Sequence, residues 1–372
     1  MSESLDFSFS EDQEALRDLA AKILGDLVTH ERLTDVERGD EWFDRRLWQS
    51  LADAGLLGIG LPEASGGGGL GFLHVCIVAE QIGATVAPVP YVPSTVAALA
   101  VAEFGDESQQ SRWLPGVANG EVVFTLALQE PNNDDPTAPT TVADVGRDGW
   151  RLTGAVHCVP AVHIADRMLV AARTGIGVGL FLVDPLAEGV VATRAIATNG
   201  EPVFQVDLAG APGQPLGDPV DGAALITWTV EHALAALCVV QTGVSERALR
   251  MTAEYASTRE QFGHPIAGFQ AVSQRAADAY IDTEAIRLTA WQAAWRLSEG
   301  LPASDEVAIA KFWAADGGQR VAHAAQHLHG GLGIDVDYPL HRYFLAAKQG
   351  EFALGGATAQ LRRIGATLAS SG

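Results

Sequence analysis

The sequence predicts an α+β protein in which a β region lies between two helical regions. Apolar residues recur at helical spacing through residues 1–118 and again through residues 221–372. Between them, residues 119–220 contain short β-branched runs separated by Gly, Pro and Asp, which is typical of strands. We therefore expect an N-terminal helical domain, a middle β-barrel or sandwich domain and a C-terminal antiparallel four-helix bundle with these boundaries.

The composition of the 372-residue chain narrows its possible partners. A net charge of −22 disfavours nucleic acid and anionic membrane surfaces, because both would repel it. The N-terminus is acidic and polar without a signal peptide, and we expect no apolar run of the roughly 20 residues that span a bilayer. Cys76, Cys158 and Cys238 are far apart in apolar sequence, so we predict no disulfide framework, no metal site and a cytoplasmic location.

Three helices are expected in the first region. One follows Ser10, a suitable N-cap, and others cover "RRLWQSLADAG", which ends at Gly55, and "FLHVCIVAEQIGA". The first helix carries an apolar face made of Leu16, Leu19, Ile23 and Leu27. The glycine run "SGGGGLG" at 65–71 invites comparison with a phosphate-binding loop, but no Lys-Ser/Thr follows it and no strand clearly precedes it. We expect a flexible loop there.

The middle region contains six strand-like runs and one long loop. The runs are "EVVFTLAL", "GWRLTGAVHCV", "ADRMLVAA", "GVGLFLVD", "GVVATRAI" and "VFQVDLAG". The proline- and aspartate-rich "EPNNDDPTAPTT" at 130–141 is predicted as a loop.

Helical periodicity returns near residue 222 and continues to the end of the chain. A helix of more than 30 residues is predicted over 223–259, and three more are expected near 269–300, 303–330 and 338–370. The apolar stripe of the long helix comprises Val230, Leu234, Leu237, Val244, Ala248 and Tyr255.

The stretch "STREQFGHPIAGFQAV" (257–272) joins the first two of these helices and concentrates chemistry at a turn. Arg259 offers a fork of donors for a phosphate or carboxylate, Gln261 adds donors and acceptors, and Phe262 adds a flat apolar face. Together they suit a dinucleotide. The alternative is structural: Arg259 pairs with Glu260 or with a carboxylate on a neighbouring helix, and Phe262 fills the core of the turn.

Motifs along the whole chain resemble the acyl-CoA dehydrogenase family. "YASTREQFGHPIAGFQAVSQRAADAYID" resembles the signature R-x-x-F-G-x-x-I-x-x-F-Q-x-x-x-x-x-x-A-D, and "DFSFSEDQEALRDLAAKIL" is similar to the N-terminal helix. "PEASGGGGLGFLHVCIVAEQIG" resembles the family's P-E-x-x-G-G-x-G loop, "ALQEP" its x-x-T-E-P strand motif, and "HLHGGLGI" its Q-x-H-G-G-x-G turn. The motifs occur in the family's order and cover essentially the whole chain.

The resemblance implies an FAD enzyme that removes a proton from Cα of an acyl-CoA and passes the Cβ hydride to the flavin. Members are usually tetramers built from dimers, with FAD at a subunit interface, and an electron-acceptor flavoprotein is the expected redox partner. By resemblance, the residues that would contact FAD across a dimer interface are Arg259, Gln261, Phe262, Gly330 and Gly331. Glycines at the last two positions would let the backbone approach the diphosphate.

The family's pattern breaks where the catalytic base and the chain's own flavin contacts should be. Aligned on Lys348, the usual base position falls on Leu354, and the minority position and its neighbouring CoA-binding arginine fall on Ala233 and Leu234. Further departures are Gln129 in place of the flavin-binding threonine, Cys158-Val159-Pro160 in place of the aromatic-Ile-Ser/Thr segment, "NNDD" after Glu-Pro, and His327 in place of a glutamine. The catalytic residue is therefore unknown from the sequence.

Two functions of different kinds follow. In the favoured one, the chain lacks its own base and completes the FAD site of a homologous, base-bearing subunit in an α2β2 complex. Actinobacterial family members of this kind act on steroid side-chain CoA thioesters, and this chain resembles that branch. In the alternative, the chain is a self-sufficient homotetramer whose base has moved to Glu351 or Glu231. Otherwise these two are surface carboxylates, and His329 is a turn or interface histidine. A purely structural or sensor role is the least favoured.

Overall fold

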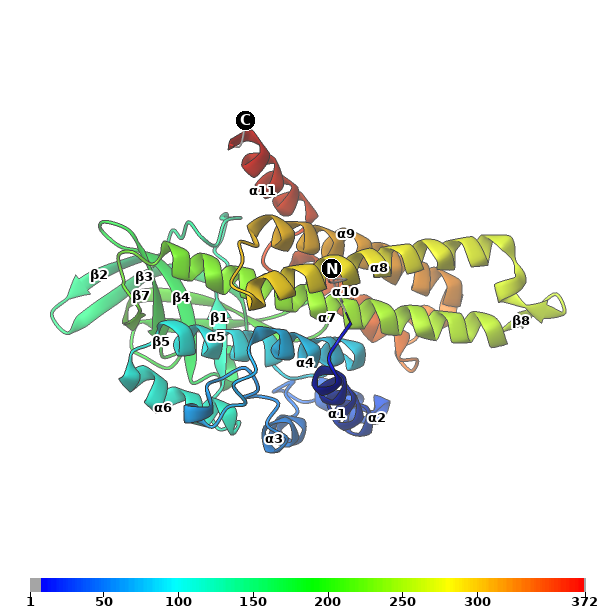
Figure 1. The fold of residues 1–372 in the computed structure, drawn as a ribbon, viewed down its shortest axis with the longest axis horizontal. Coiled ribbons are helices and arrows are strands. Elements are labelled where there is room, and N and C mark those ends of the chain that lie inside the picture. The colour runs from blue at the N-terminus through cyan, green and yellow to red at the C-terminus, as the bar shows by residue number, and fades with distance from the viewer. Residues whose placement is uncertain (1–7, 371–372) are drawn as a thin grey trace, which may run out of the picture.

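The computed structural model describes residues 8–370, and its elements follow the order helices, strands, helices (Figure 1). The first helices are α1 (Glu11–Leu27), α2 (His30–Arg38), α3 (Arg45–Asp53), η1 (Glu63–Ser65), α4 (Phe72–Thr85), α5 (Tyr91–Phe104) and α6 (Glu107–Ala118). The middle region holds β1 (Phe124–Ala127), β2 (Val142–Gly146), β3 (Gly149–Pro160), η2 (Val162–Ile164), β4 (Arg167–Arg173), β5 (Val178–Val183), β6 (Val190–Ile196) and β7 (Pro202–Leu216). The last region holds α7 (Ala223–Thr258), β8 (Glu260–Gln261), β9 (His264–Pro265), η3 (Ile266–Gly268), α8 (Gln270–Ser298), α9 (Ser304–His329), η4 (Gly330–Ile334), α10 (Leu340–Phe352) and α11 (Ala357–Ser370).

The start of α1 follows directly from its sequence. The Ser10 side chain accepts a hydrogen bond from the backbone N–H of Gln13, and the Gln13 side chain accepts one from the Ser10 N–H, which is a complete capping box. Leu16, Ala20 and Leu24 are buried on one face. The predicted first helix is confirmed, but its predicted apolar face is partly wrong, because Leu19 is 43% exposed.

The glycine run at 65–71 is a packed loop, and our expectation of flexibility there is wrong. Its backbone N–H groups are already used: Gly68 donates to the Gly58 carbonyl, Gly69 to Leu61 and Leu70 to Ile59. A Cβ on Gly67 would lie 2.2 Å from the Leu61 carbonyl oxygen, so only glycine fits. Because these amides bond within the protein, the loop offers no phosphate cradle.

Five strands of the middle region close into a barrel. β4, β2, β3, β7 and β5 are hydrogen-bonded in that order, and β5 pairs with β4 to complete the ring. β1 extends the sheet beside β4, and β6 pairs with β7. The apolar interior includes Val156, Val170, Phe181 and Val206. The sequence patterns missed β2, because its last three residues are exposed and supply no apolar alternation.

The 36-residue helix α7 is the central element of the protein. By length and composition it could cross a membrane, contrary to our expectation that no such segment exists, since its most apolar window has a mean hydropathy of 1.7. However, 61% of that window is buried inside the protein, so α7 is a core helix. It packs with α8, α9 and α10 as a four-helix bundle, and it also contacts α4 of the first region.

The helix predicted over 338–370 is two helices. α10 ends at Phe352, and α11 begins at Ala357 after a turn in which Leu354 has φ of 54° and Gly355 has φ of 97°. The Gly355-Gly356 pair, which disfavours a continuous helix, accounts for the break. α11 packs against α9 and projects from the bundle (Figure 1).

A buried carboxyl group lies where α4 meets α8. Glu80 is 7% exposed, and its Oε1 accepts a hydrogen bond of 3.1 Å from the indole N–H of Trp291. Burial, reinforced by the nearby charge of Glu246, raises the pKa of Glu80 from 4.5 to about 7.

This shift predicts a pH-dependent effect of Glu80→Gln. Between pH 4.5 and 7 the folded state binds more protons than the unfolded state, so the wild-type protein loses stability as pH rises through this range. A glutamine keeps an acceptor for Trp291 without the charge. Urea unfolding should show the variant to be more stable than wild type by about 2 kcal/mol at pH 8 and similar to it at pH 4.5. An equal difference at both pH values would contradict the burial of a charge here.

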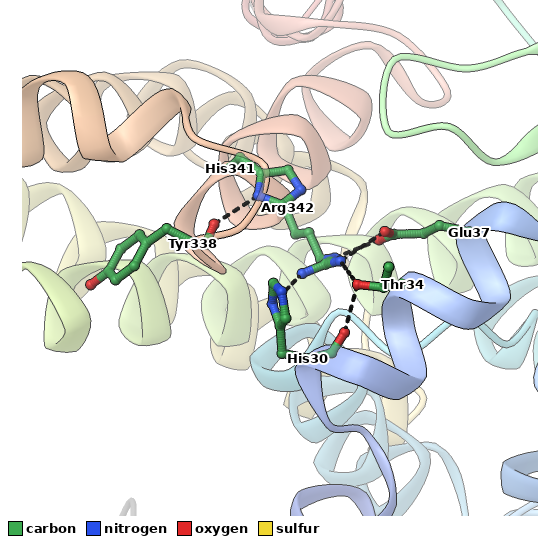
Figure 2. A network of polar contacts seen from close by, with 6 residues as sticks. All are labelled: His30, Thr34, Glu37, Tyr338, His341 and Arg342. Atoms are coloured by element: carbon green, nitrogen blue, oxygen red, sulfur yellow. Dashed lines mark hydrogen bonds and ion pairs between the residues drawn. The ribbon is translucent and has the colours of Figure 1, made fainter.

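A polar network joins the two helical regions (Figure 2). Arg342 of α10 is 7% exposed and donates through Nε and Nη2 to the two carboxylate oxygens of Glu37 in α2, at 2.5 and 2.8 Å. It also donates to Thr34 Oγ1 at 3.0 Å and to His30 Nδ1 at 2.8 Å, so the proton of neutral His30 resides on Nε2. One guanidinium thus fastens α2 to the bundle.

Candidate functional site

The stretch between α7 and α8 contains a strained hairpin at the tip of the molecule (Figure 1). β8 and β9 are joined by Phe262 and Gly263, whose φ values are 56° and 81°. Positive φ at both central residues defines a type I′ turn, which glycine adopts readily and phenylalanine does not. Phe262 is also 90% exposed. Its ring meets the edge of the Phe269 ring, with 6.1 Å between centroids, but most of it stays exposed, so this strained residue is a candidate for contact with another molecule.

Arg259 is held by its backbone and free at its side chain. Its N–H donates to the Tyr255 carbonyl at the end of α7, and its own carbonyl accepts from the Ile266 N–H, both at 2.8 Å. Within residues 8–370, the guanidinium makes no ion pair and no hydrogen bond. The structural alternative, in which Arg259 pairs with a carboxylate, is therefore wrong for the described residues. Phe262 contacts the edge of Phe269 but is 90% exposed, so it does not fill the core of the turn.

Gln261 of the hairpin and the turn at Gly330-Gly331, here called the glycine turn, are also exposed. The Gln261 side-chain amide donates to the Glu260 carbonyl at 2.8 Å and is exposed. Gly330 follows the end of α9 with φ of 62° and ψ of −136°, a conformation that requires glycine. Gly331 is exposed, and a Cβ at either glycine would meet nothing within 4 Å, so both lie open to an approaching group. A shallow pocket beside this turn is lined by Arg275, His323, Gln326, His327, Gly330 and Ile334.

The position expected for the catalytic base is occupied by a packed leucine. Leu354 contacts the main hydrophobic core, and its backbone N–H donates to the Gln129 side-chain oxygen at 3.3 Å. The positions resembling the family's base and its flavin-binding threonine are thus bonded to each other. The minority positions, Ala233 and Leu234, are 1% and 0% exposed in the core. None of these side chains can remove a proton.

The two carboxylates proposed as relocated bases are already engaged. Glu351, in the last turn of α10, forms an ion pair with Lys348. Glu231 of α7 accepts a hydrogen bond from Ser304, and burial raises its pKa. Both are half-buried side chains with local partners.

The segments near Gln129 and Cys158, where the resemblance would place flavin contacts within one chain, also depart from a ligand-binding surface. Cys158, which we expected in apolar surroundings, is exposed with φ of 51° at an irregularity in the β3–β7 pairing. Glu130, after Gln129, is 4% exposed, and its carboxylate accepts from the N–H groups of Thr140 and Thr141. It therefore closes the 130–141 loop and is not available to a ligand.

Sequence reasoning missed Lys311, a buried lysine of α9. Lys311 is 1% exposed, and its ammonium donates to the carbonyls of Gly350 and Glu351. These carbonyls lie at the end of α10, where a helix has no further backbone N–H groups of its own to bond them. Burial lowers the pKa of Lys311 to about 8. A lone lysine inside the apolar run "VAIAKFWAA" was the available signal. It stabilises the helix end immediately before Leu354.

Comparison with known proteins identifies the class. The sequence matches two family descriptions, "Acyl-CoA dehydrogenase, N-terminal domain" over residues 10–121 and "Acyl-CoA dehydrogenase, C-terminal domain" over residues 220–369. The fold and these matches define an FAD-dependent oxidoreductase that acts on CH–CH bonds. The chain belongs to the acyl-CoA dehydrogenase family.

Several relatives are similar over nearly the whole length. Acyl-CoA dehydrogenase FadE27 of Mycobacterium tuberculosis is 43% identical over 99% of this chain and 100% of its own. Acyl-CoA dehydrogenase FadE28 of the same organism is 33% identical over 86% and 91%. Among solved structures, the ChsE4-ChsE5 complex from M. tuberculosis has a TM-score of 0.93 at 43% identity, covering 98% and 99%. A variant of the Tcur3481-Tcur3483 steroid ACAD has a TM-score of 0.93 at 44% identity, covering 97% and 98%.

Proposed function

We propose that this chain is a base-lacking subunit of a heteromeric acyl-CoA dehydrogenase and completes the FAD site of a homologous, base-bearing partner in an α2β2 complex. The observation that carries the proposal is the hydrogen bond from the Leu354 N–H to Gln129. It joins the two positions at which the family would hold its base and its flavin. The chain retains the family's motifs at the hairpin but has no carboxylate at either recognised base position.

The exposed hairpin suits FAD binding, whereas the region around Gln129 and Leu354 in the same chain does not. Arg259 would donate to the FAD diphosphate, since its guanidinium has no other partner among the described residues. Phe262 would pack against a flat ring, Gln261 would supply polar contacts, and Gly330 and Gly331 would admit the backbone to the diphosphate. Bound FAD supplies the hydride acceptor, and proton removal from Cα falls to the partner's carboxylate.

The substrate, the electron acceptor and the cellular location are proposed from the chain's family and its relatives. Two solved relatives are complexes, and one is described as a steroid ACAD. We propose that the complex oxidises an acyl-CoA thioester with a steroid side chain, passes electrons to an acceptor flavoprotein and resides in the cytoplasm. We also propose three domains, at residues 1–118, 119–220 and 221–372, because the helical and β regions change at these points.

Purification alone and with a partner tests the proposal. Expressed alone, the chain should be colourless and inactive; coexpressed with a homologue that carries the missing glutamate, it should yield a yellow complex that oxidises acyl-CoA with an artificial acceptor. A yellow, active homo-oligomer with one FAD per chain would sink the proposal and support the alternative, a homotetramer with its base at Glu351 or Glu231.

Arg259→Ala sharpens the test within the complex. Losing a charge-assisted contact to the diphosphate should weaken FAD binding roughly 30-fold, measured by flavin fluorescence on the apo-complex. Arg194→Ala removes an equally charged, exposed side chain from the barrel strand β6 and should leave FAD affinity unchanged. Equal affinity for both variants would remove Arg259 from the site.

A further inference from the structure

The arginine hairpin and the glycine turn come from distant parts of the chain, yet a dinucleotide would have to meet both. No hydrogen bond joins residues 259–268 to residues 330–334 within the described part of the chain. The helices that flank them, including α7 and α9, which precede them, therefore contribute to their relative placement.

A stacked pair of rings connects those two helix ends. The Tyr255 ring, in the last turn of α7, lies parallel to the His329 ring, with 4.5 Å between centroids and 19° between planes. His329 is the final residue of α9 and directly precedes Gly330. The Tyr255 carbonyl also accepts the hydrogen bond from the Arg259 N–H. Tyr255 thus contacts the residue at which the hairpin begins, Arg259, and the residue directly before the glycine turn, His329.

The histidine in this stack cannot rotate freely. It is 3% exposed, and its Nδ1 lies 2.8 Å from the Ala325 carbonyl, so Nδ1 carries the proton. Nε2 is then the acceptor, and it accepts a hydrogen bond of 3.3 Å from the Tyr338 hydroxyl. Hydrogen bonds at both ring nitrogens fix the plane against which Tyr255 stacks.

We propose that Tyr255 and His329 are positioning residues that set the hairpin and the glycine turn at the separation the FAD diphosphate requires. This inference rests on the proposed function, because it assumes that both turns face one cofactor. The stack contributes no group to the cofactor itself. It acts through Arg259 and Gly330, which follow these residues in the chain.

Variants of Tyr255 in the coexpressed complex test the inference. Tyr255→Leu should weaken FAD binding about tenfold, whereas Tyr255→Phe, which keeps the ring, should bind within about twofold of wild type. A general loss of structure would lower the thermal midpoint of the complex as well, so that midpoint is measured in parallel.

A double-variant cycle separates positioning from general stability. If Tyr255 acts in part through Arg259, Tyr255→Leu should weaken FAD binding by a smaller factor in the Arg259→Ala background than in the wild-type complex. Fully additive effects, or wild-type affinity in Tyr255→Leu, would overturn the inference. If Arg259→Ala itself leaves affinity unchanged, the assignment of Arg259 to the FAD site under the proposed function fails; if only Tyr255→Leu is silent, that assignment stands and the inference alone is overturned.

Should Tyr255→Leu fail to assemble, Tyr338→Phe decides the question. It removes only the hydroxyl that holds His329 and leaves every ring in place. FAD binding weakened by roughly threefold supports the positioning role. Unchanged binding overturns it.

Discussion

Gly243→Ala is expected to prevent the chain from folding, although it adds a single methyl group. Gly243 of α7 packs directly on the backbone of α4, so a Cβ there would lie 2.0 Å from the Glu80 carbonyl oxygen and 2.6 Å from the Ala84 nitrogen. Gly83 of α4 makes the reciprocal approach to the Val240 carbonyl. Because the colliding atoms are backbone, no rotamer change relieves the contact. We expect a loss of at least about 4 kcal/mol, measured by urea unfolding or as loss of soluble protein.

Gly25→Ala is the matched control. Gly25 lies in helix α1, is exposed, and a Cβ there would meet nothing within 4 Å. The same change should raise stability by about 0.5–1 kcal/mol, because alanine favours helix over glycine. If Gly243→Ala folded as well as Gly25→Ala, the close approach of α4 and α7 would be wrong.

Arg342→Met should cost about 3 kcal/mol of folding free energy, because it removes four hydrogen bonds and leaves the Glu37 carboxylate without its partner. Methionine fills much of the volume of the arginine's aliphatic chain. The lost folding free energy therefore measures the contacts of the guanidinium and not the creation of a cavity. Urea unfolding measures it.

Two controls accompany this change. Arg45→Met breaks the exposed pair between Arg45 and Glu41 on the surface and should cost less than about 0.5 kcal/mol. Adding Glu37→Gln to Arg342→Met should restore part of the loss, since the unpaired charge is then gone. A cost for Arg342→Met no larger than for Arg45→Met would show that the network does not hold α2 to the bundle.

Local patterns predicted most of the fold. The Ser10 cap, the Gly55 stop and the long apolar stripe of α7 depend on neighbours within a few residues, and the structure has all three. The errors arose where distant segments decide. The 65–71 loop is rigid because residues 58–61 accept its hydrogen bonds, and 338–370 divides at the Gly355-Gly356 pair.

The sequence singled out the candidate residues but could not indicate their geometry. The motif pointed to Arg259 and Phe262, but only the structure shows that Arg259 has no side-chain partner within residues 8–370 and that Phe262 is strained. The sequence placed Tyr255 on a core stripe and could not indicate its stack on His329, because a ring contact between two helix ends leaves no local pattern. The bond between Gln129 and Leu354 was hidden for the same reason.

The length of α7 has a geometric consequence for this chain. Its first turn is anchored to the barrel, where the Gly222 N–H bonds the Val178 carbonyl, and its far end carries the hairpin (Figure 1). A 36-residue helix spans about 54 Å, at about 1.5 Å per residue. Any molecule that touched the hairpin and the barrel of one chain at once would have to bridge that length.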